Sequence, residues 1–176
     1  VVKIKDAEKK YPSSAMRVIA NKKLHLTNLN KRIFDNFSKG QLIDYYEDIA
    51  KWMLPHLKDR PLSLYRFPDG VKKEGFYQKN IPDYFPDWFE RIPIEHKGKT
   101  TTYGICNSVE SLIFLANYAA VPNPWLSRID QLDKPDRMIF DLDPSKEDHK
   151  LLRQTALSLK NFLEDLPQRS RDDLNL

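Results

Sequence analysis

Cysteine and glycine are scarce in this sequence: one cysteine, Cys106, and five glycines stand among 176 residues. A single cysteine excludes an internal disulfide framework, and its apolar surroundings indicate a small core residue rather than a nucleophile. No apolar run approaches the length of a membrane span, and the first residues lack the apolar segment of a signal peptide. We find no internal repeat, Walker loop, Cys/His cluster or glycine-rich dinucleotide turn. These absences predict a cytoplasmic protein without a membrane partner.

The composition is that of a folded protein with an excess of positive charge. Apolar residues make up 40% and aromatic residues 11% of the chain, enough for a hydrophobic core. A length of 176 residues suits one ordinary domain or an incomplete piece of a larger one. The net charge is +4. The basic residues gather early, at Lys3, Lys5, Lys9, Lys10, Arg17, Lys22, Lys23, Lys31, Arg32 and Lys39. Such a segment suits a polyanion, although a solvated surface is the commoner meaning of a charge run.

Two aspartates close a short apolar segment at residues 137–145, Arg-Met-Ile-Phe-Asp-Leu-Asp-Pro-Ser. The segment is typical of a strand, whose side chains alternate between two faces. The two faces would be Ile139, Asp141 and Asp143, and Met138, Phe140 and Leu142. Neighbouring carboxylates repel each other, whereas Mg²⁺ or Mn²⁺ prefers carboxylate oxygens and leaves positions for phosphate. The alternative is a strand that runs into an Asx turn, with Asp143 and Ser145 capping the next helix.

The clearest amphipathic helix covers residues 39–54. Ser38 and Gln41 have the spacing of a capping box, and the apolar residues behind them recur at helical intervals. Pro55 is expected to end the helix. Lys39 then falls in the first turn, where free backbone N–H groups and the helix dipole favour an anion. A lysine there does not help helix stability, which is a small argument for a phosphate site beside it.

Aromatic and basic residues stand close together in two predicted strands, residues 62–67 and 76–79, joined through a turn signal at Pro68-Asp69-Gly70. The residues concerned are Arg66, Phe76, Tyr77 and Lys79. Rings suit base faces and cations suit phosphates, as a site for single-stranded nucleic acid requires. Core packing is the alternative for either ring. Adjacent strand residues face opposite ways, however, so at least one ring needs another explanation if only one face is buried.

The remaining patterns complete a mixed α/β fold, which we class as α+β. Residues 1–21 suit a basic arm or a loosely attached strand, and residues 167–176 are expected to be an unstructured tail. Between them the patterns predict a strand at 23–29, a packed loop with a turn of helix at 81–89, a hairpin of 92–96 with 101–106, and a helix beginning at 109. A second amphipathic helix follows Asp143, begins at Glu147 and Asp148, and carries apolar residues at helical spacing from Leu151 to Leu166. Pro93 places the first hairpin strand at an edge. Asn107 or Ser108 caps the helix at 109, and residues 121–125 end it.

Many short motifs agree with one family in order and spacing. They are Leu26-Thr27-Asn28-Leu29-Asn30-Lys31, Asp44-Tyr45-Tyr46, Leu54-Pro55-His56-Leu57, Arg60-Pro61, Arg66-Phe67-Pro68-Asp69-Gly70, Phe76-Tyr77-Gln78-Lys79, Leu115-Ala116-Asn117, Asn123-Pro124-Trp125, and Asp136-Arg137 through Asp141-Leu142-Asp143-Pro144. With these motifs the chain resembles the polymerase domain of bacterial and archaeal DNA ligase D, the primase-like enzyme of non-homologous end joining. The agreement of many motifs at once makes the resemblance specific.

The resemblance implies an archaeo-eukaryotic primase-like polymerase fold, of which residues 22–166 would be the N-terminal part. It implies that Asp141 and Asp143 are catalytic and bind the metals, Mn²⁺ or Mg²⁺. It also implies that Lys31 and Lys39 hold the 5′-phosphate of the downstream DNA strand.

Further contacts and partners follow from the same resemblance. Phe76 and Tyr77 would stack on template bases, with Arg66 and Lys79 near the nucleic acid or nucleotide. The implied partners are DNA with 5′-phosphate ends, nucleoside triphosphates, a Ku-type end-binding protein and a ligase domain or protein. The implied setting is the nucleoid.

Two departures from the family pattern matter. The loop Val121-Pro122-Asn123 looks one residue short and lacks the acidic residue usual before Pro124-Trp125, although Asn123 can still offer hydrogen bonds to DNA or nucleotide. After Leu166 the family continues into a box that grips the triphosphate and then into a third metal-binding aspartate, and residues 167–176 resemble neither. We therefore expect an incomplete, C-terminally truncated copy of the domain with weak or no activity.

Three functions remain to be compared. The main hypothesis is a primase-type DNA repair polymerase that adds nucleotides at double-strand-break ends. The alternative is a non-catalytic module that binds the 5′-phosphate of DNA ends. A phosphatase of the haloacid dehalogenase type ranks below both, because Pro144-Ser145 replaces the Gly-Thr that follows its acidic pair and the basic arm would have no role.

Overall fold

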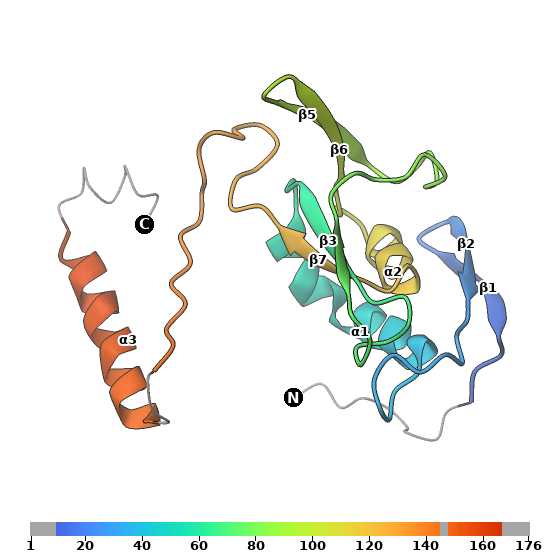
Figure 1. Cartoon of the computed structure of the whole chain (residues 1–176), viewed down its shortest axis with the longest axis horizontal. Helices are drawn as coiled ribbons and strands as arrows, with labels where there is room; N and C mark the ends of the chain where they lie inside the picture. Colours follow the sequence, from blue (N-terminus) through green and yellow to red (C-terminus); the bar gives the residue numbers. More distant parts are fainter. Residues whose placement is uncertain (1–9, 145–147, 167–176) are drawn as a thin grey trace. The chain divides into compact units, whose positions relative to one another are not determined.

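The computed structural model describes residues 10–144 and 148–166, and the chain divides into two compact units, Val1–Trp125 and Leu126–Leu176. The elements follow the chain in the order β1, β2, α1, β3, β4, β5, β6, α2, β7 and α3 (Figure 1). All of these elements except α3 belong to the first unit. The mixture of helices and antiparallel strands confirms the predicted α+β class.

A five-stranded antiparallel sheet is organised around β3 (Leu62–Arg66). Strand β7 (Ala120–Pro124) pairs with β3 along its whole length, β4 (Phe76–Gln78) pairs with its last three residues, and β6 (Lys99–Gly104) meets its first residue. Strand β5 (Arg91–His96) pairs with β6 at the edge. Alternate residues of β3 are fully buried, so one face of this strand belongs to the core.

Two helices complete the core of the first unit. Helix α1 (Lys39–Leu57) begins at the predicted capping box, where the Ser38 Oγ accepts from the Gln41 N–H and the Gln41 side chain accepts from the Ser38 N–H at 2.9 Å. Helix α2 (Val109–Asn117) begins after Ser108, one of the two predicted caps. The two helices pack against each other, and their apolar residues join those of β2 and β3 in one cluster.

Helix α1 extends beyond its predicted end. Pro55 lies inside the helix, which continues to Leu57, so the prediction that the proline ends it is wrong. The missing proline N–H falls in the last turn, and the Lys58 N–H still donates to the Leu54 carbonyl at 3.0 Å. Leu57 is buried, and its packing favours the extra residues.

Strands β1 (Ser14–Ile19) and β2 (Lys22–Thr27) form a separate two-stranded antiparallel hairpin. Strand β2 confirms the prediction of a strand at 23–29, although it ends two residues earlier. Residues 14–19 of the expected arm or loosely attached strand pair with β2 along their length, while residues 1–9 lie outside the part that the structure describes. The buried residues of β2 join the hairpin to the core.

The hairpin of β5 and β6 is confirmed, with a two-residue turn. Lys97 and Gly98 have φ of 51° and 73°, the left-handed conformation that such a turn requires. Pro93 lies in β5 at the edge of the sheet, where a missing N–H is tolerated. Residues 81–89 pack several apolar side chains into the core as predicted, but they form turns rather than a turn of helix.

Strand β7 occupies a segment for which the sequence predicted only the end of a helix. Pro122 and Pro124 cannot donate hydrogen bonds, which disguises the strand, but β7 pairs with β3 alone among the described strands.

Cys106 is fully buried, and burial raises the pKa of its thiol to about 12, as expected of a core residue. No helix in the described ranges is long and apolar enough to cross a membrane.

In the second unit, the acidic segment does not form the predicted strand. Residues 137–144 have no regular secondary structure, and none of the described strands pairs with them, so the prediction of a strand at 137–142 is wrong. A strand is held by hydrogen bonds to a neighbour, and an apolar sequence alone does not supply that neighbour. Within the described residues, the acidic segment therefore belongs to neither sheet.

Helix α3 (His149–Glu164) confirms the predicted second amphipathic helix. Its cap is Asp148, whose Oδ1 accepts from the N–H groups of Lys150 and Leu151 at 3.0 and 2.9 Å. Asp143 is thus not the cap. The other proposed cap, Ser145, and the tail at 167–176 lie outside the described residues.

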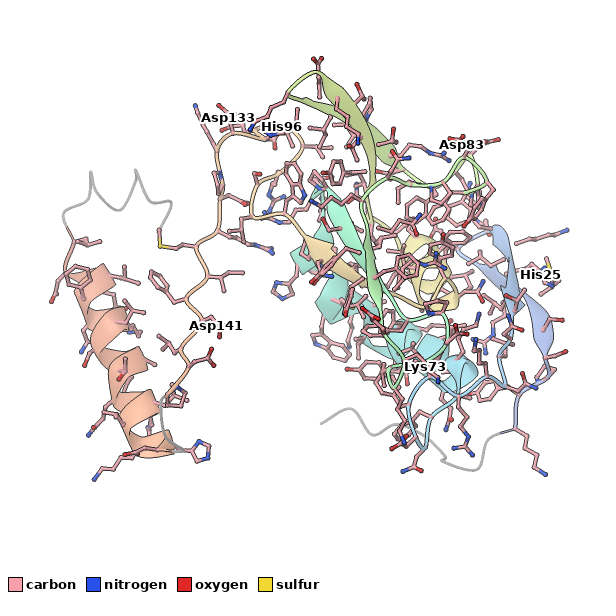
Figure 2. All side chains as sticks on the ribbon, in the orientation of Figure 1. His25, Lys73, Asp83, His96, Asp133 and Asp141 are labelled. Atoms are coloured by element: carbon pink, nitrogen blue, oxygen red, sulfur yellow. The ribbon has the colours of Figure 1, made fainter. Side chains whose placement is uncertain are left out.

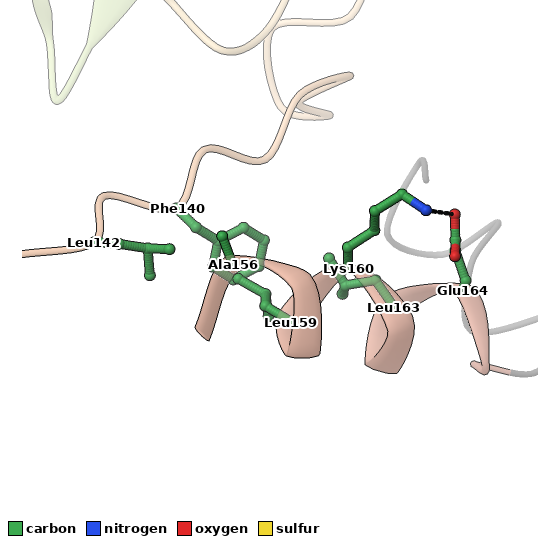
Figure 3. A pocket seen from close by; sticks show the side chains of 7 residues that line it. All are labelled: Phe140, Leu142, Ala156, Leu159, Lys160, Leu163 and Glu164. Carbon is green, nitrogen blue, oxygen red and sulfur yellow. Dashed lines mark hydrogen bonds and ion pairs between the residues drawn. The ribbon is translucent and has the colours of Figure 1, made fainter. Parts of the chain in front are cut away.

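The apolar side of the acidic segment lies against α3 (Figure 3). The side chains that line the groove between them, of about 460 Å³, are Phe140, Leu142, Ala156, Leu159, Lys160, Leu163 and Glu164. Phe140 and Leu142 therefore share one side, as the alternation of the sequence predicts, although no strand forms. No residue of α3 is buried.

Candidate nucleic-acid interface and carboxylate pair

Lys31 and Lys39, which we call the lysine pair, are held together where the chain enters α1. Lys31 lies in the loop after β2, and Lys39 is the first residue of the helix. The Lys39 N–H donates to the Lys31 carbonyl at 2.8 Å, so the backbone closes the loop between them. The Lys39 Nζ donates to the Asn117 carbonyl at 2.8 Å. The Lys31 Nζ donates to the Asp69 Oδ1 at 2.7 Å.

The positive charge of the lysine pair is only partly balanced. Lys39 is 5% exposed, and burial, with a smaller effect of the nearby Lys31 charge, lowers the pKa of its ammonium to about 8. The hydrogen bond and charge of Lys31 lower the pKa of Asp69. Within the described residues, the bonded acceptor of Lys39 is a carbonyl and not a carboxylate. An external anion would relieve the repulsion between the two ammonium groups.

The backbone N–H groups at the start of α1 are already used inside the protein. The Gly40 N–H donates to the Leu29 carbonyl at 2.8 Å, and the Gln41 N–H donates to the Ser38 Oγ at 3.3 Å. Together with the bond from the Lys39 N–H, these contacts show that the predicted argument from free N–H groups is wrong for these three residues. Anion binding here depends on the two ammonium groups and the helix dipole.

The two predicted stacking residues lie on β4 and face opposite sides of the sheet. In the register of β3 and β4, Phe76 is opposite Arg66 and Tyr77 is opposite Tyr65. Phe76 is 46% exposed and Tyr77 is 65% exposed. Tyr77 also stacks on Tyr65, with ring centroids 4.5 Å apart. Core packing therefore accounts for neither ring, and both present surface on which a base can stack.

Arg66 ends β3 on the sheet face that carries Phe76. Its guanidinium carbon is 3.5 Å from the Tyr118 ring centroid and 5.4 Å from the Phe76 ring centroid. Its Nη1 donates to the Tyr118 hydroxyl at 2.9 Å and to the Gln78 Oε1 at 3.1 Å. Lys79 follows β4 as an exposed cation. A held positive charge beside an exposed ring suits the joint recognition of a phosphate and a base.

Asn123 lies on β7, on the sheet face that carries Tyr77. The register places Asn123 opposite Ser63, and Ser63 shares one face of β3 with Tyr65. The Asn123 side chain is exposed. The structure thus brings Asn123 and Tyr77 to one face of the sheet, whereas Arg66 lies on the other.

Asp141 and Asp143, which we call the carboxylate pair, are exposed and belong to the second unit, where Figure 2 labels Asp141. Leu142 between them turns toward α3. The described residues contain no group of three or more His, Cys, Asp or Glu side chains that could hold a metal ion. Two carboxylates still suit Mg²⁺ or Mn²⁺, which binds carboxylate oxygens and keeps several waters. The pair fits such an ion as part of a site.

Sequence reasoning misses three residues that hold the candidate cations. Asp69, Asn117 and Tyr118 hold Lys31, Lys39 and Arg66, respectively. Asp69 and Asn117 lie in motifs that match the ligase D polymerase family, and their place in these motifs could have marked them as site residues. Tyr118 carries no signal beyond its place after such a motif.

A family model described as LigD, primase-polymerase domain, matches residues 38–171. The matched range contains Lys39, both rings of β4 and the carboxylate pair, and it begins after Lys31. Among solved structures, the chain is similar to the polymerase domain from Mycobacterium tuberculosis Ligase D in complex with DNA. The TM-score is 0.68 at 28% identity, and the match covers 80% of this chain and 53% of that chain.

Two curated relatives show the same similarity. The chain is 37% identical over 130 residues to the multifunctional non-homologous end joining protein LigD of Mycolicibacterium smegmatis, covering 70% of this chain and 17% of that protein. It is 32% identical over 145 residues to the bifunctional non-homologous end joining protein LigD of Bacillus subtilis, covering 81% of this chain and 23% of that protein. The chain therefore spans less than a quarter of the length of either relative.

Proposed function

This chain belongs to the LigD primase-polymerase family, and on that premise we propose that it is part of a DNA repair polymerase that acts at double-strand-break ends. In this function it binds DNA that carries a 5′-phosphate and adds nucleotides to a 3′-hydroxyl. The observation that carries the proposal is the lysine pair, two cations held close together with incomplete charge balance. DNA as the ligand is supported by the solved relative, a polymerase domain in complex with DNA.

The lysine pair binds the 5′-phosphate in this proposal. A phosphate monoester carries about 1.5 to 2 negative charges at neutral pH, which matches two ammonium groups. Lys39 gives one N–H to the Asn117 carbonyl and, as an ammonium with three N–H groups, keeps others for a ligand. Burial of its stem fixes where the ammonium lies, so little side-chain freedom is lost on binding.

In this proposal, the two rings of β4 contact the unpaired strand together with Arg66 of β3 and with Lys79, which follows β4. Phe76 and Tyr77 face opposite sides of the sheet, so they stack on different bases rather than on one. Arg66 and Lys79 supply charge for phosphates beside the rings. Asn123, on the face of Tyr77, offers hydrogen bonds to a nucleotide.

The carboxylate pair holds Mn²⁺ or Mg²⁺ in the catalytic form of this proposal. Such an ion, when bound, activates a hydroxyl and stabilises a leaving pyrophosphate. Asp141 and Asp143 contribute exposed carboxylate oxygens. Leu142, the residue between them, packs its side chain toward α3. The other partners, proposed from family membership alone, are nucleoside triphosphates, a Ku-type end-binding protein and a ligase domain or protein, in the nucleoid.

A non-catalytic DNA-end-binding module is the second candidate. It is favoured by the exposure of the carboxylate pair and by the lack, within the described residues, of a third metal-binding side chain beside it. It needs only the lysine pair and the rings of β4. The phosphatase alternative is withdrawn, because Asp141 does not stand at the end of a strand and the chain belongs to another family.

The first experiment compares two DNA ends by fluorescence anisotropy at fixed salt. One duplex has a recessed 5′-phosphate, and its match has a 5′-hydroxyl. We expect tighter binding of the phosphorylated end, with Lys31→Ala or Lys39→Ala each reducing that preference about tenfold through loss of a charge-assisted contact. Lys23→Ala, at an exposed position on β2, is the matched control. Equal affinity of the unmodified chain for both ends would refute the role of the lysine pair.

A second experiment separates the polymerase from the binding module. Primer extension with Mn²⁺ and all nucleotides is compared between this chain and the double variant Asp141→Ala/Asp143→Ala. Extension that disappears in the double variant supports the polymerase. Phosphate-dependent binding with no extension in either protein supports the binding module.

A further inference from the structure

The C-terminal end of α2 receives two cationic side chains from other elements. Helix α2 has no basic residue in its own last turn, although the last carbonyls of a helix need donors. The Asn117 carbonyl accepts from the Lys39 Nζ at 2.8 Å, and the Tyr118 carbonyl accepts from the Arg66 Nη2 at 3.4 Å. One helix end thus contacts a cation of each candidate DNA-binding region in the first unit.

Asn117 is fixed by its own side chain. Its Oδ1 accepts from the Thr27 N–H at 3.0 Å, and its Nδ2 donates to the His25 carbonyl at 3.3 Å. Both bonds tie the end of α2 to β2, just before the loop that carries Lys31. A shift of the Asn117 side chain would therefore move the carbonyl that holds Lys39.

Tyr118 holds Arg66 in two ways. Its hydroxyl accepts from the Arg66 Nη1 at 2.9 Å, and its ring lies 3.5 Å from the guanidinium carbon. The hydroxyl also donates to the Gln78 Oε1 at 3.3 Å, which links the contact to β4. The ring is nearly parallel to that of Phe114, at an interplanar angle of 10°, and this stacking ties it to α2.

We propose that Asn117 and Tyr118 are positioning residues that set the placement of Lys39 and Arg66, so that the end of α2 positions one cation for the 5′-phosphate and another for the unpaired strand. This inference rests on the proposed function. Lys39 belongs to α1 and Arg66 to β3, so a shared anchor fixes the two cations relative to each other before DNA arrives. Such preorganisation reduces the cost of ordering side chains on binding.

A purely structural role for the same contacts predicts different behaviour. If Lys39 and Arg66 only satisfied the carbonyls of α2, loss of the Asn117 side chain would lower thermal stability and weaken all DNA binding alike. A positioning role predicts a selective loss, because only the 5′-phosphate contact depends on where the Lys39 ammonium lies. It also predicts a changed titration, since a Lys39 released from burial regains a pKa closer to its ordinary value of 10.5. Lys31, paired with Asp69, is the other charged group that affects this pKa.

The test measures affinity for 5′-phosphorylated and 5′-hydroxyl DNA as a function of pH. Asn117→Ala is compared with Asn107→Ala, which removes a bridging asparagine before the other end of α2, bonded to Asp59 and Glu90. We expect Asn117→Ala to reduce the phosphate preference about fivefold at neutral pH. We also expect the loss of preference at high pH, centred near the Lys39 pKa of about 8, to move upward. Asn107→Ala should change neither quantity.

A second variant keeps the inference testable if Asn117→Ala does not fold. Asn117→Asp retains an acceptor for the Thr27 N–H, loses the donor to the His25 carbonyl and places a negative charge near Lys39. It should likewise raise the pH at which the phosphate preference is lost. The contact between Tyr118 and Arg66 is tested by Tyr118→Phe, which keeps the ring and removes the hydroxyl. This variant should bind a single-stranded overhang about threefold more weakly. Its preference for a 5′-phosphate should be unchanged.

The outcomes separate the two proposals. Lack of any phosphate preference in the unmodified chain would refute the proposed role of the lysine pair. A preference in the unmodified chain that Asn117→Ala and Asn117→Asp leave at full strength, with the same dependence on pH, would overturn the positioning role alone. A uniform loss of affinity for both ends with a lowered melting temperature would also overturn it.

Discussion

The two units of the chain differ in how firmly they hold their candidate functional side chains. In the first unit, Lys39 and Arg66 are bonded to the end of a buried helix, beside a core whose largest members are fully buried. In the second unit, the carboxylate pair is exposed, and no residue of α3 is buried. The comparison teaches that the side chains proposed to recognise nucleic acid are built into a packed scaffold. The carboxylates proposed to bind a metal are exposed and lie in a segment without regular secondary structure.

Stability provides the largest test of this contrast. Leu64→Ala removes a fully buried side chain of β3 and should lower the free energy of unfolding by about 2 to 5 kcal/mol. Leu157→Ala makes the same chemical change where the side chain is 49% exposed on α3, and should cost about 0.5 kcal/mol or less. Urea denaturation followed by circular dichroism measures both. Equal losses in the two variants would contradict the difference between the units.

Base stacking on β4 is expected to have the next largest effect. Tyr77→Ala should weaken binding of DNA with a single-stranded overhang by about 1 to 3 kcal/mol, the contribution of one stacked base. The melting temperature should fall only slightly, because the Tyr77 side chain is 65% exposed and loses mainly its stacking on Tyr65. Trp52→Ala, which removes a ring that is 55% exposed on α1, is the matched control. A similar loss of affinity in both variants would argue against a stacking site on β4.

The dependence on pH should be moderate and bell-shaped for the 5′-phosphate preference. In the proposed function, charged Lys39 binds the phosphate. Its pKa is lowered to about 8, so the preference should be lost as the pH rises through that value. On the acidic side, the phosphate gains a proton near its second pKa of about 6 and the preference also declines. Anisotropy titrations with the paired duplexes measure the curve. A preference that stays constant well above pH 8 would exclude Lys39 as the phosphate ligand.

The same pKa shift should act on stability in the opposite direction. An unfolded lysine has a pKa near 10.5, whereas Lys39 in the folded protein has one of about 8. Between these values the unfolded state binds more protons, so the contribution of Lys39 to stability rises with pH. Lys39→Met should remove this rise, as measured by urea denaturation at neutral pH and at pH values near 10.5. If the free energy of unfolding of Lys39→Met still rises with pH as in the unmodified chain, the rise comes from another titrating group.

Metal binding by the free chain should show the smallest effect. Two exposed carboxylates should bind Mn²⁺ with a Kd on the order of a millimolar. Asp141→Asn should weaken this binding about threefold, as expected for an exposed charge. Titration calorimetry measures the affinity, with Asp130→Asn, at another exposed acid of the second unit, as the control. A micromolar affinity would show that the two carboxylates already belong to a formed metal site. It would contradict the view that the second unit holds its candidate side chains less firmly than the first.

Local patterns predicted the elements whose signals lie within a few residues. The Ser38 capping box set the start of α1, and the Lys97-Gly98 turn set the hairpin of β5 and β6. The predictions that failed depended on distant partners. The pairing of β7 with β3 is invisible in a segment with two prolines, and residues 137–142 read as a strand although the described residues supply no neighbour for it.

The candidate site was predictable in its residue types but not in its contacts. The resemblance identified Lys39 and Arg66, yet their bonded partners at the end of α2, Asn117 and Tyr118, are 78 and 52 residues away in sequence. A contact across such a distance follows only from packing of the core. The free N–H groups expected at the start of α1 were already bonded to the preceding loop, which a helix pattern by itself cannot show.

In the ion pair between Lys31 and Asp69, the Asp69 carboxylate occupies the ammonium group that a 5′-phosphate would bind, so carboxylate and phosphate compete for Lys31. Binding at Lys31 is then an exchange of one anion for another, and an end without a phosphate has little with which to displace the carboxylate. Because Lys31 is already neutralised, fewer salt ions are released there, and Asp69→Asn should steepen the salt dependence of binding by about one ion. The variant should bind every DNA end more tightly and distinguish phosphorylated ends less well. In the proposed function, Asp69 would thus lower the affinity for DNA and raise the preference for phosphorylated ends.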